Sequence, residues 1–460
     1  MEQIVEEKTS IYRRALALAV PMMIQNGITN AVMLIDNLMV GTLGTESMTA
    51  VAVAAQIIFV FNLAIFGAIS GPGIYCAQYY GNQNKEGFGN VFRLKLLICF
   101  CVFVVGLIIP ILCGSHLVGM FMNGSTTGVN NDLTLELGVQ YLQLMLWGFL
   151  PFWITQVYAS SLRETGESII PMVSGVSAVV TDIVFNYLLI FGKFGFPCWG
   201  VKGAAIATVI SRFVEMAVLL IWIFIKKNKF EYVATALNKL SFRFAGMGKV
   251  LVKSLPMFLN EFLWAAGLAM IFQSYSLRGL EVVAALNISN AIFNVTIVVI
   301  FAMGNSVGIL IGQLLGASKF EEAKRDAFKL TYFNGNLGLI MMAVLLCFSK
   351  FFPSCYETSD QIRILAQNLI VVNAICLPMF GVLNALYFTL RSGGKTFITF
   401  LFDSVFSLVV AYPVALVLSK YSSLGILTVY IIIQGLDLIK IIIGYTIVKK
   451  GLWISNLATQ

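Results

Sequence analysis

The sequence has few charged residues and only one histidine. Charged residues make up 11% of the 460 residues, whereas soluble globular proteins carry about 25%. His116 is the only histidine, which excludes a metal site or a proton relay built from several histidines. No Ser/His pair surrounds it, and no metal-ligand motif or phosphate-binding Gly-Lys motif occurs. We therefore expect no enzyme activity, no cofactor and no metal centre.

Paired cysteines and basic patches are also missing. The eight cysteines show no paired spacing, so no disulfide can be inferred. The formal net charge is +8, but the basic residues lie between apolar runs and form no patch of their own. The charge therefore does not indicate binding to nucleic acid.

Apolar runs of helix length recur along the whole chain. Hydrophobic residues make up 59% of it, and the mean hydropathy is +0.88. A helix crosses the hydrocarbon core with about 20 apolar residues, and the runs do not alternate as the strands of a transmembrane barrel do. The sequence predicts an all-α polytopic membrane protein with twelve spans, at 14–39, 50–78, 92–113, 133–158, 168–191, 203–226, 249–273, 281–313, 325–348, 361–388, 395–418 and 423–447.

The distribution of Lys and Arg predicts the orientation of these spans. Most of the 30 basic residues fall on one side when the N-terminus is placed inside the cell, as the positive-inside rule requires. We expect a multi-pass protein of the plasma (cytoplasmic) membrane with both termini in the cytoplasm.

The sequence contains an internal repeat. One constant shift in residue number places Pro21 on Pro256, and Gly73, Ala77, Gln78 and Gly81 on Gly308, Gly312, Gln313 and Gly316. A slightly smaller shift places 162–166 on 390–394. The longest polar interval lies near the middle. We therefore predict an N-terminal lobe (1–226), a cytoplasmic linker (227–248) and a C-terminal lobe (249–460), related by a pseudo-twofold axis along the membrane normal with a substrate path between them.

Several polar residues lie inside the predicted spans of the N-terminal lobe. A carboxylate near the bilayer centre is costly and usually faces a cavity or a partner. Asp36 and Asp182 are such carboxylates, and Asn186 shares a helical face with Asp182. Asn62 and Thr208 add neutral oxygens. This oxygen-rich set predicts a site for a proton or a hard cation such as Na⁺.

The C-terminal lobe offers Glu261 and Asp403. Neither has a cation within a helical turn, so Glu261 is a candidate for binding a coupling ion or a cationic substrate. Asp403 follows Lys395 closely and is expected nearer the membrane interface. Two further charged pairs, each three residues apart, are predicted to be internal ion pairs: Arg212 with Glu215 and Asp437 with Lys440.

The ordered motifs resemble the multidrug and toxic compound extrusion (MATE) transporters of prokaryotic type. The resemblance covers essentially the whole chain and rests on five segments: 21–44, 77–81, 162–171, 188–192 and 200–208. It implies a V-shaped pair of six-helix pseudo-symmetric lobes that exports organic cations and other amphipathic drugs against H⁺ or Na⁺ influx.

The resemblance also assigns roles to residues. Asp36 matches the acidic residue that the family uses for cation coupling and helix bending. Asp182 and Asn186 match a pair that commonly has the opposite order, and Thr208 matches a hydroxyl of the same cluster. Glu261 matches an acidic residue of some branches, which also carry one in the tenth span, where this chain has none.

The prediction from the sequence is thus a cation-coupled multidrug efflux antiporter that works by alternating access. It would act as a monomer, with small-molecule drugs and membrane lipids as its partners and no nucleic acid. A flippase for lipid-linked precursors, from the same superfamily, is the alternative. A receptor or channel fits the composition but not the two equal repeats.

Overall fold

The computed structural model describes residues 10–122, 131–236 and 247–459. Within these ranges the chain is helical and contains no strand. It has 12 helices long and apolar enough to cross a membrane, which confirms the all-α fold and the predicted number of spans. Most of the helices are longer than the apolar runs, because they continue through polar residues that flank the runs; α3, for example, has 37 residues.

The first six spans are single helices. They are α2 (Ile11–Gly41), α3 (Thr45–Gly81), α4 (Lys85–Met122), α5 (Asn131–Glu164), α6 (Ile169–Phe191) and α7 (Val201–Ile225). A 3-10 turn η1 (Lys193–Gly195) and a short helix α8 (Glu231–Ala234) lie outside them.

The last six spans are less regular. They are α9 (Met247–Ser276), α10 (Leu280–Gly316), α11 (Phe320–Phe348) continued by α12 (Phe351–Ser354), and α13 (Asp360–Ser392). The eleventh combines α14 (Thr396–Phe400), the π-helical turns η2 (Leu401–Val405) and η3 (Ser407–Ala411), and α15 (Tyr412–Tyr421). The twelfth combines α16 (Ile426–Gly435) and α17 (Asp437–Lys450).

Contacts divide the chain into two compact units. The N-terminal unit contains residues 24–76 and 85–248, and the C-terminal unit contains 1–23, 77–84 and 249–460, each as far as described. The start of α2 and the end of α3 therefore group with the second half of the chain. The predicted lobe boundaries stay a prediction, and residues 237–246 of the predicted linker lie outside the described residues.

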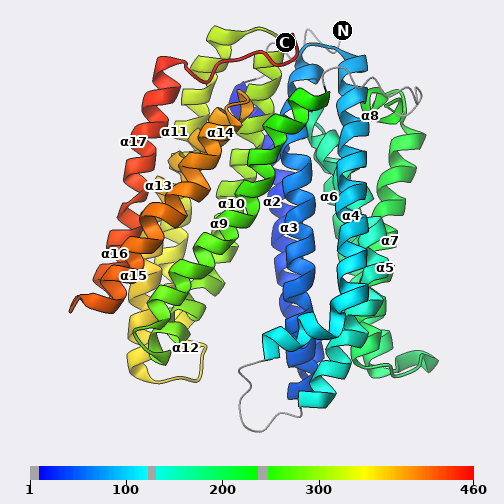
Figure 1. The fold of residues 1–460 in the computed structure, drawn as a ribbon, viewed down its shortest axis with the longest axis vertical. Coiled ribbons are helices and arrows are strands. Elements are labelled where there is room, and N and C mark those ends of the chain that lie inside the picture. The colour runs from blue at the N-terminus through cyan, green and yellow to red at the C-terminus, as the bar shows by residue number, and fades with distance from the viewer. Residues whose placement is uncertain (1–9, 123–130, 237–246, 460) are drawn as a thin grey trace. The chain divides into compact units, whose positions relative to one another are not determined.

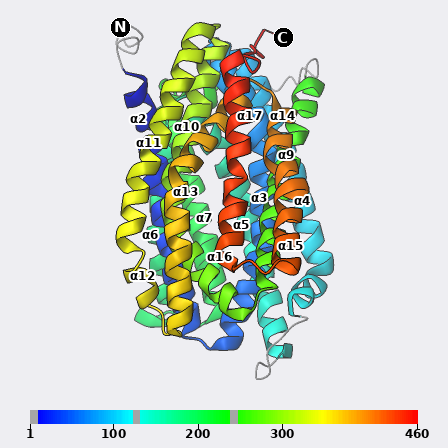
Figure 2. The same ribbon diagram turned by 90° about the vertical axis from the view of Figure 1, so that its left-hand side faces the viewer.

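The C-terminal unit packs around α13. Figure 2 shows α13 beside α11 and α10, and α17 also contacts it. Gly338 and Gly381 let α11 and α13 approach closely, because a Cβ on either would meet the backbone of the other helix. Between them the Asn334 amide donates to the Gly381 carbonyl oxygen over 2.9 Å. Small residues and an interhelical hydrogen bond are what hold helices together in a membrane.

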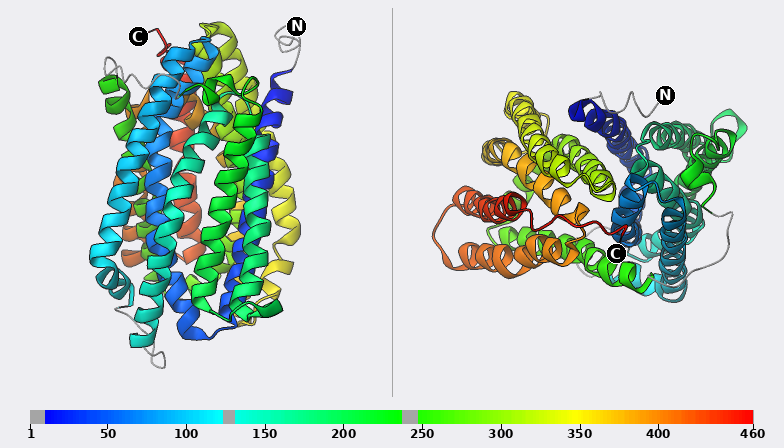
Figure 3. Two further views of the ribbon diagram at one scale, coloured as in Figure 1. Left: turned by 90° about the vertical axis from the view of Figure 1, so that its right-hand side faces the viewer. Right: turned by 90° about the horizontal axis from the view of Figure 1, so that it is seen from above.

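The N-terminal unit packs around α5 and α7. Helix α4 lies against α5, as Figure 3 (left) shows, and α7 contacts both α5 and α6. Its core includes Tyr141 and Leu142 of α5, Ile190 of α6 and Ala205 of α7. This packing brings polar residues of α2, α5, α6 and α7 together inside the unit.

Candidate functional site

Two acidic residues of the N-terminal unit share one amide group. The Asn186 side-chain nitrogen on α6 donates to Asp36 Oδ1 on α2 over 2.8 Å and to Asp182 Oδ2 over 3.2 Å. Asp182 and Asn186 lie one turn apart on α6, so their shared face is confirmed. We call Asp36, Asp182 and Asn186 the acid cluster.

The acid cluster is covered but not saturated with hydrogen bonds. Asp182 is 7% exposed and Asn186 is 2% exposed, and Asp36 is half-buried. Asp182 Oδ1 and Asn186 Oδ1 are buried acceptors that receive no hydrogen bond among the described residues. A buried acceptor without a donor is costly, so these oxygens have unused capacity for a cation or a proton.

Helices α5 and α7 complete the surroundings of the acid cluster. Thr208, Ser211 and Arg212 of α7 all act electrostatically on the Asp182 carboxyl. The Tyr141 hydroxyl on α5 interacts with Thr208, and the carboxyl groups of Asp36 and Asp182 both act on it electrostatically. The structure therefore brings Thr208 to the cluster, and it adds Tyr141, which no sequence pattern had selected.

Arg212, whose charge acts on the Asp182 carboxyl, is already paired with another acid. Its Nη1 lies 3.0 Å from Glu215 Oε2, and its guanidinium lies 5.2 Å from the centre of the Phe152 ring. The predicted ion pair is thus confirmed. In the C-terminal unit, Lys440 Nζ lies 2.9 Å from Asp437 Oδ1, which confirms the second one.

Two of the predicted site residues lie neither in the acid cluster nor beside it. Asn62 is half-buried on α3, and no hydrogen bond among the described residues joins it to the cluster. Glu261 lies on α9 in the C-terminal unit, whereas the acid cluster belongs to the N-terminal unit. The sequence could not separate these positions, because apolar spacing does not show which helix faces meet.

Glu261 has charged neighbours from other helices. Arg391 of α13 and Asp403 of η2 both act electrostatically on its carboxyl. No cation lies within a helical turn of Glu261, as expected, and Arg391 acts on it from another helix. A carboxylate with one cation and one further acid nearby remains a candidate for binding a cationic group.

Asp403 lies in a polar cluster of the C-terminal unit. The Asn260 amide donates to Asp403 Oδ2 over 3.1 Å and to the Tyr387 hydroxyl over 3.2 Å. The Ser404 hydroxyl donates to Asn260 Oδ1 over 2.7 Å. The π-helical turn η2 carries both Asp403 and Ser404, and such turns are frequent at functional sites. Sequence spacing could not reveal this arrangement.

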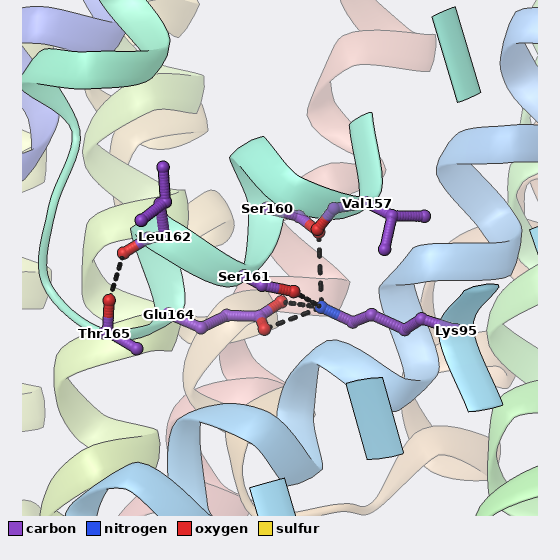
Figure 4. A network of polar contacts seen from close by, with 7 residues as sticks. All are labelled: Lys95, Val157, Ser160, Ser161, Leu162, Glu164 and Thr165. Atoms are coloured by element: carbon purple, nitrogen blue, oxygen red, sulfur yellow. Dashed lines mark hydrogen bonds and ion pairs between the residues drawn. The ribbon is translucent and has the colours of Figure 1, made fainter. Parts of the chain in front are cut away.

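A buried ion pair joins α4 to α5 in the N-terminal unit (Figure 4). Lys95 Nζ lies 2.7 Å and 2.6 Å from the two carboxylate oxygens of Glu164 and 3.2 Å from the hydroxyls of Ser160 and Ser161. The Lys95 side chain is 0% exposed. The distribution of Lys and Arg predicts that Lys95 lies at or near the cytoplasmic side. The structure places it inside the unit with a partner.

The whole chain is similar to known transporters. The family profile MatE matches residues 21–188 and 256–417. The probable multidrug resistance protein YoeA of Bacillus subtilis is 25% identical over 431 residues, covering 93% of this chain and 91% of that protein. The probable multidrug resistance protein NorM of Thermotoga maritima is 25% identical over 431 residues, covering 93% and 89%.

Solved structures share the fold. One is described as the outward-facing conformation of a multidrug resistance MATE family transporter, with a TM-score of 0.85, 20% identity and coverage of 96% of this chain and 97% of that chain. Another, from Pyrococcus furiosus, has a TM-score of 0.84 and 20% identity over 96% of both chains. Because the family profile matches well over half of the residues, the chain belongs to the MatE family of multidrug and toxic compound extrusion transporters.

Proposed function

We propose that this protein is a multidrug efflux antiporter that couples export of organic cations and other amphipathic compounds to entry of H⁺ or Na⁺. The observation that supports it is the acid cluster, in which one amide donates to two carboxyl groups and two further buried oxygens receive no hydrogen bond from any residue that the structure describes. Relatives named as multidrug resistance proteins support the substrate class.

The acid cluster has the chemistry that such coupling needs. Two negative carboxylates held this close repel each other, and a bound cation or a shared proton removes the repulsion. Na⁺ and H⁺ both fit oxygen donors, and the free oxygens of Asp182 and Asn186 supply them. Thr208 adds a hydroxyl group that acts electrostatically on Asp182. Binding of the coupling ion would therefore tighten the link between α2 and α6.

Helix α2 would carry this change along the chain. Its residues up to Met23 belong to the C-terminal unit, and Asp36 belongs to the N-terminal unit. Pro21 lies inside the helix, where it removes one backbone hydrogen bond and favours a kink. Loading and unloading of Asp36 would change how firmly the second part of α2 is held, and the helix would bend near Pro21. Alternating access by rocking of the two halves needs such a hinge.

Uptake of a fluorescent organic cation into inverted membrane vesicles tests the proposal. A pH gradient and a Na⁺ gradient are applied separately, and the one that drives uptake identifies the coupling ion. Asp36→Asn should abolish driven uptake with the protein still inserted. Asp132→Asn is the matched control, because Asp132 is exposed in the first turn of α5. Full uptake by Asp36→Asn would contradict the role of the acid cluster.

The same vesicles test the alternative. A flippase for lipid-linked precursors would respond to neither gradient and would move a fluorescent lipid-linked pyrophosphate instead. The acidic character of the acid cluster favours cation transport, since a pyrophosphate needs cationic groups. Residence in the plasma membrane, cytoplasmic termini and action as a monomer remain part of the proposal.

A further inference from the structure

The segment after α17 is fastened to helix ends of the C-terminal unit. We call residues 453–459 the strap; Figure 1 shows it in red, leaving the end of α17. Trp453 is 0% exposed and Leu457 is 3% exposed. The Trp453 indole nitrogen donates to the Val448 carbonyl oxygen over 3.2 Å. The strap is therefore anchored where it leaves α17.

The strap and the end of α3 bind each other through Gln78. The Gln78 side-chain nitrogen donates to the Ser392 carbonyl oxygen over 2.8 Å and to the Ser455 carbonyl oxygen over 3.2 Å. The Leu457 backbone N–H donates to Gln78 Oε1 over 2.6 Å. Gln78 is 0% exposed. One buried amide thus joins α3, the last residue of α13 and two positions of the strap.

The strap also covers the end of α10. The Asn456 side-chain nitrogen donates to the Gly316 carbonyl oxygen over 3.2 Å and to the Ser318 hydroxyl over 2.9 Å. Gly316 is the last residue of α10, and the final carbonyl groups of a helix have no partner within it. Asn456 supplies one of these partners, as Gln78 does at the end of α13.

Beneath the strap, α3 and α10 cross with their backbones in contact. A Cβ on Gly81 would overlap the Gln313 carbonyl, and a Cβ on Gly316 would overlap the Gln78 carbonyl. The contact is reciprocal, and it pairs the two copies of the repeated Gln-x-x-Gly motif. Ala77 of α3 is 3% exposed and lies against Gly312 of α10. A Cβ added at Gly312 would lie 3.2 Å from the Cβ of Ala77.

We propose that the strap is a latch that keeps the end of α3 closed onto α10 and must release during each transport cycle. This inference rests on the proposed function, because alternating access requires helices to part at one side of the membrane in one state. Orientation from the basic residues predicts that this is the cytoplasmic side. Without the strap, Gln78 loses two of its hydrogen bonds, those with Ser455 and Leu457.

Accessibility of the crossing tests the latch directly. Ala77→Cys places a thiol between α3 and α10, and its reaction with a maleimide is followed at that residue by mass spectrometry. A stop codon after Gly451 removes the strap and should speed the reaction about tenfold or more, because the buried hydrogen bonds of Gln78 and Asn456 are lost. Gln78→Met, which keeps the strap but removes its amide partner, should speed it several-fold.

Asn334→Leu in the Ala77→Cys protein is the matched control. Like Gln78, Asn334 is a fully buried amide that donates to a backbone carbonyl of α13, but its bond lies away from the strap. Labelling at residue 77 should not change in this variant. The latch is refuted if the strapless protein reacts no faster, or if Asn334→Leu speeds the reaction as much as Gln78→Met does.

A cross-link tests whether release is needed for export. Ser318→Cys and Asn456→Cys place two thiols where the hydroxyl and amide now meet. Oxidation should stop export of the fluorescent cation, reduction should restore it, and each single variant should stay active. Full export by protein whose cross-link is verified would overturn the proposal. The labelling result does not depend on export, so absence of export in every variant would refute the proposed function and leave the latch to be judged on labelling.

Discussion

Asn186 on α6 reaches Asp36 on α2 with a 2.8 Å hydrogen bond across 150 positions of sequence. The same nitrogen contacts Asp182, so one neutral group holds two acids that would otherwise repel. The position of this amide determines how close the carboxyl groups stand. It should therefore matter for transport as much as the acids do.

Asn186→Leu should lower gradient-driven export about tenfold or more, because each hydrogen bond from an amide to a carboxylate contributes about 1.5–3 kcal/mol. Removal of the amide lets the carboxyl groups move apart and weakens the site for the coupling ion. Uptake by inverted vesicles at several strengths of the driving gradient measures the effect.

Asn305→Leu provides the comparison for Asn186→Leu. Asn305 is an exposed amide that donates to a carbonyl of its own helix, Phe301. Its loss should leave export unchanged. Equal activity of the two variants would show that the acid cluster does not depend on the shared amide.

The acid cluster shows what sequence can and cannot predict here. Intramembrane carboxylates are rare, so Asp36 and Asp182 stood out, and spacing placed Asn186 beside Asp182. The contact between α2 and α6 depends on tertiary packing and could not be predicted. The Lys and Arg distribution places Lys95 at or near the cytoplasmic side, but it does not show burial, which depends on the helices that cover the residue.

The same limit applies in the C-terminal unit. The repeat identified Gln78 and Gly316, since both copies keep the motif. Their contact with each other is visible only in three dimensions. The strap has no helical periodicity and is too short to give a signal, so nothing in the sequence marked Asn456 as its fastening point.

The Lys95–Glu164 pair should be costly to break but not to replace. Lys95→Met leaves the Glu164 carboxylate buried without its cation, which typically destabilises a protein by about 3–5 kcal/mol. The double variant Lys95→Met/Glu164→Met removes both charges and should recover most of the lost stability. The stability of the parent, the single variant and the double variant is compared by heating each protein in detergent and measuring the loss of its monodisperse peak in size-exclusion chromatography.

Lys85→Met is the exposed counterpart of Lys95→Met. Lys85 pairs with Glu231 over 2.7 Å, but the two side chains are 52% and 49% exposed. Such surface pairs contribute about 0–1 kcal/mol, so the midpoint of thermal unfolding of Lys85→Met should be close to that of the parent protein. If the double variant at the buried pair were as unstable as Lys95→Met alone, packing rather than charge would explain the loss.

Gly316→Ala should disrupt the crossing of α3 and α10. The added methyl group would overlap the Gln78 carbonyl, and a backbone atom cannot step aside as a flexible side chain can. Overpacking of this kind costs about 1–3 kcal/mol. The yield of folded protein and its thermal midpoint should both fall.

Gly27→Ala tests the same change where space is available. An added Cβ at Gly27 meets nothing within 4 Å, and alanine is the better helix former by about 1 kcal/mol. This variant should be as stable as the parent or more stable. A similar loss in both variants would point to a general requirement for glycine rather than to the contact with α3.

Glu261→Gln should change the response to substrate charge. The Glu261 carboxyl lies near Arg391 and Asp403, and a cationic drug would join this set by pairing with the acids. Loss of the charge should raise the half-saturating concentration of a cationic dye about tenfold, as expected for one charged hydrogen bond, and leave that of a neutral amphipathic drug unchanged. Glu281→Gln, an exposed acid in the first turn of α10, should change neither. If both drugs lost affinity equally, Glu261 would act in ion coupling or folding instead of recognising the substrate.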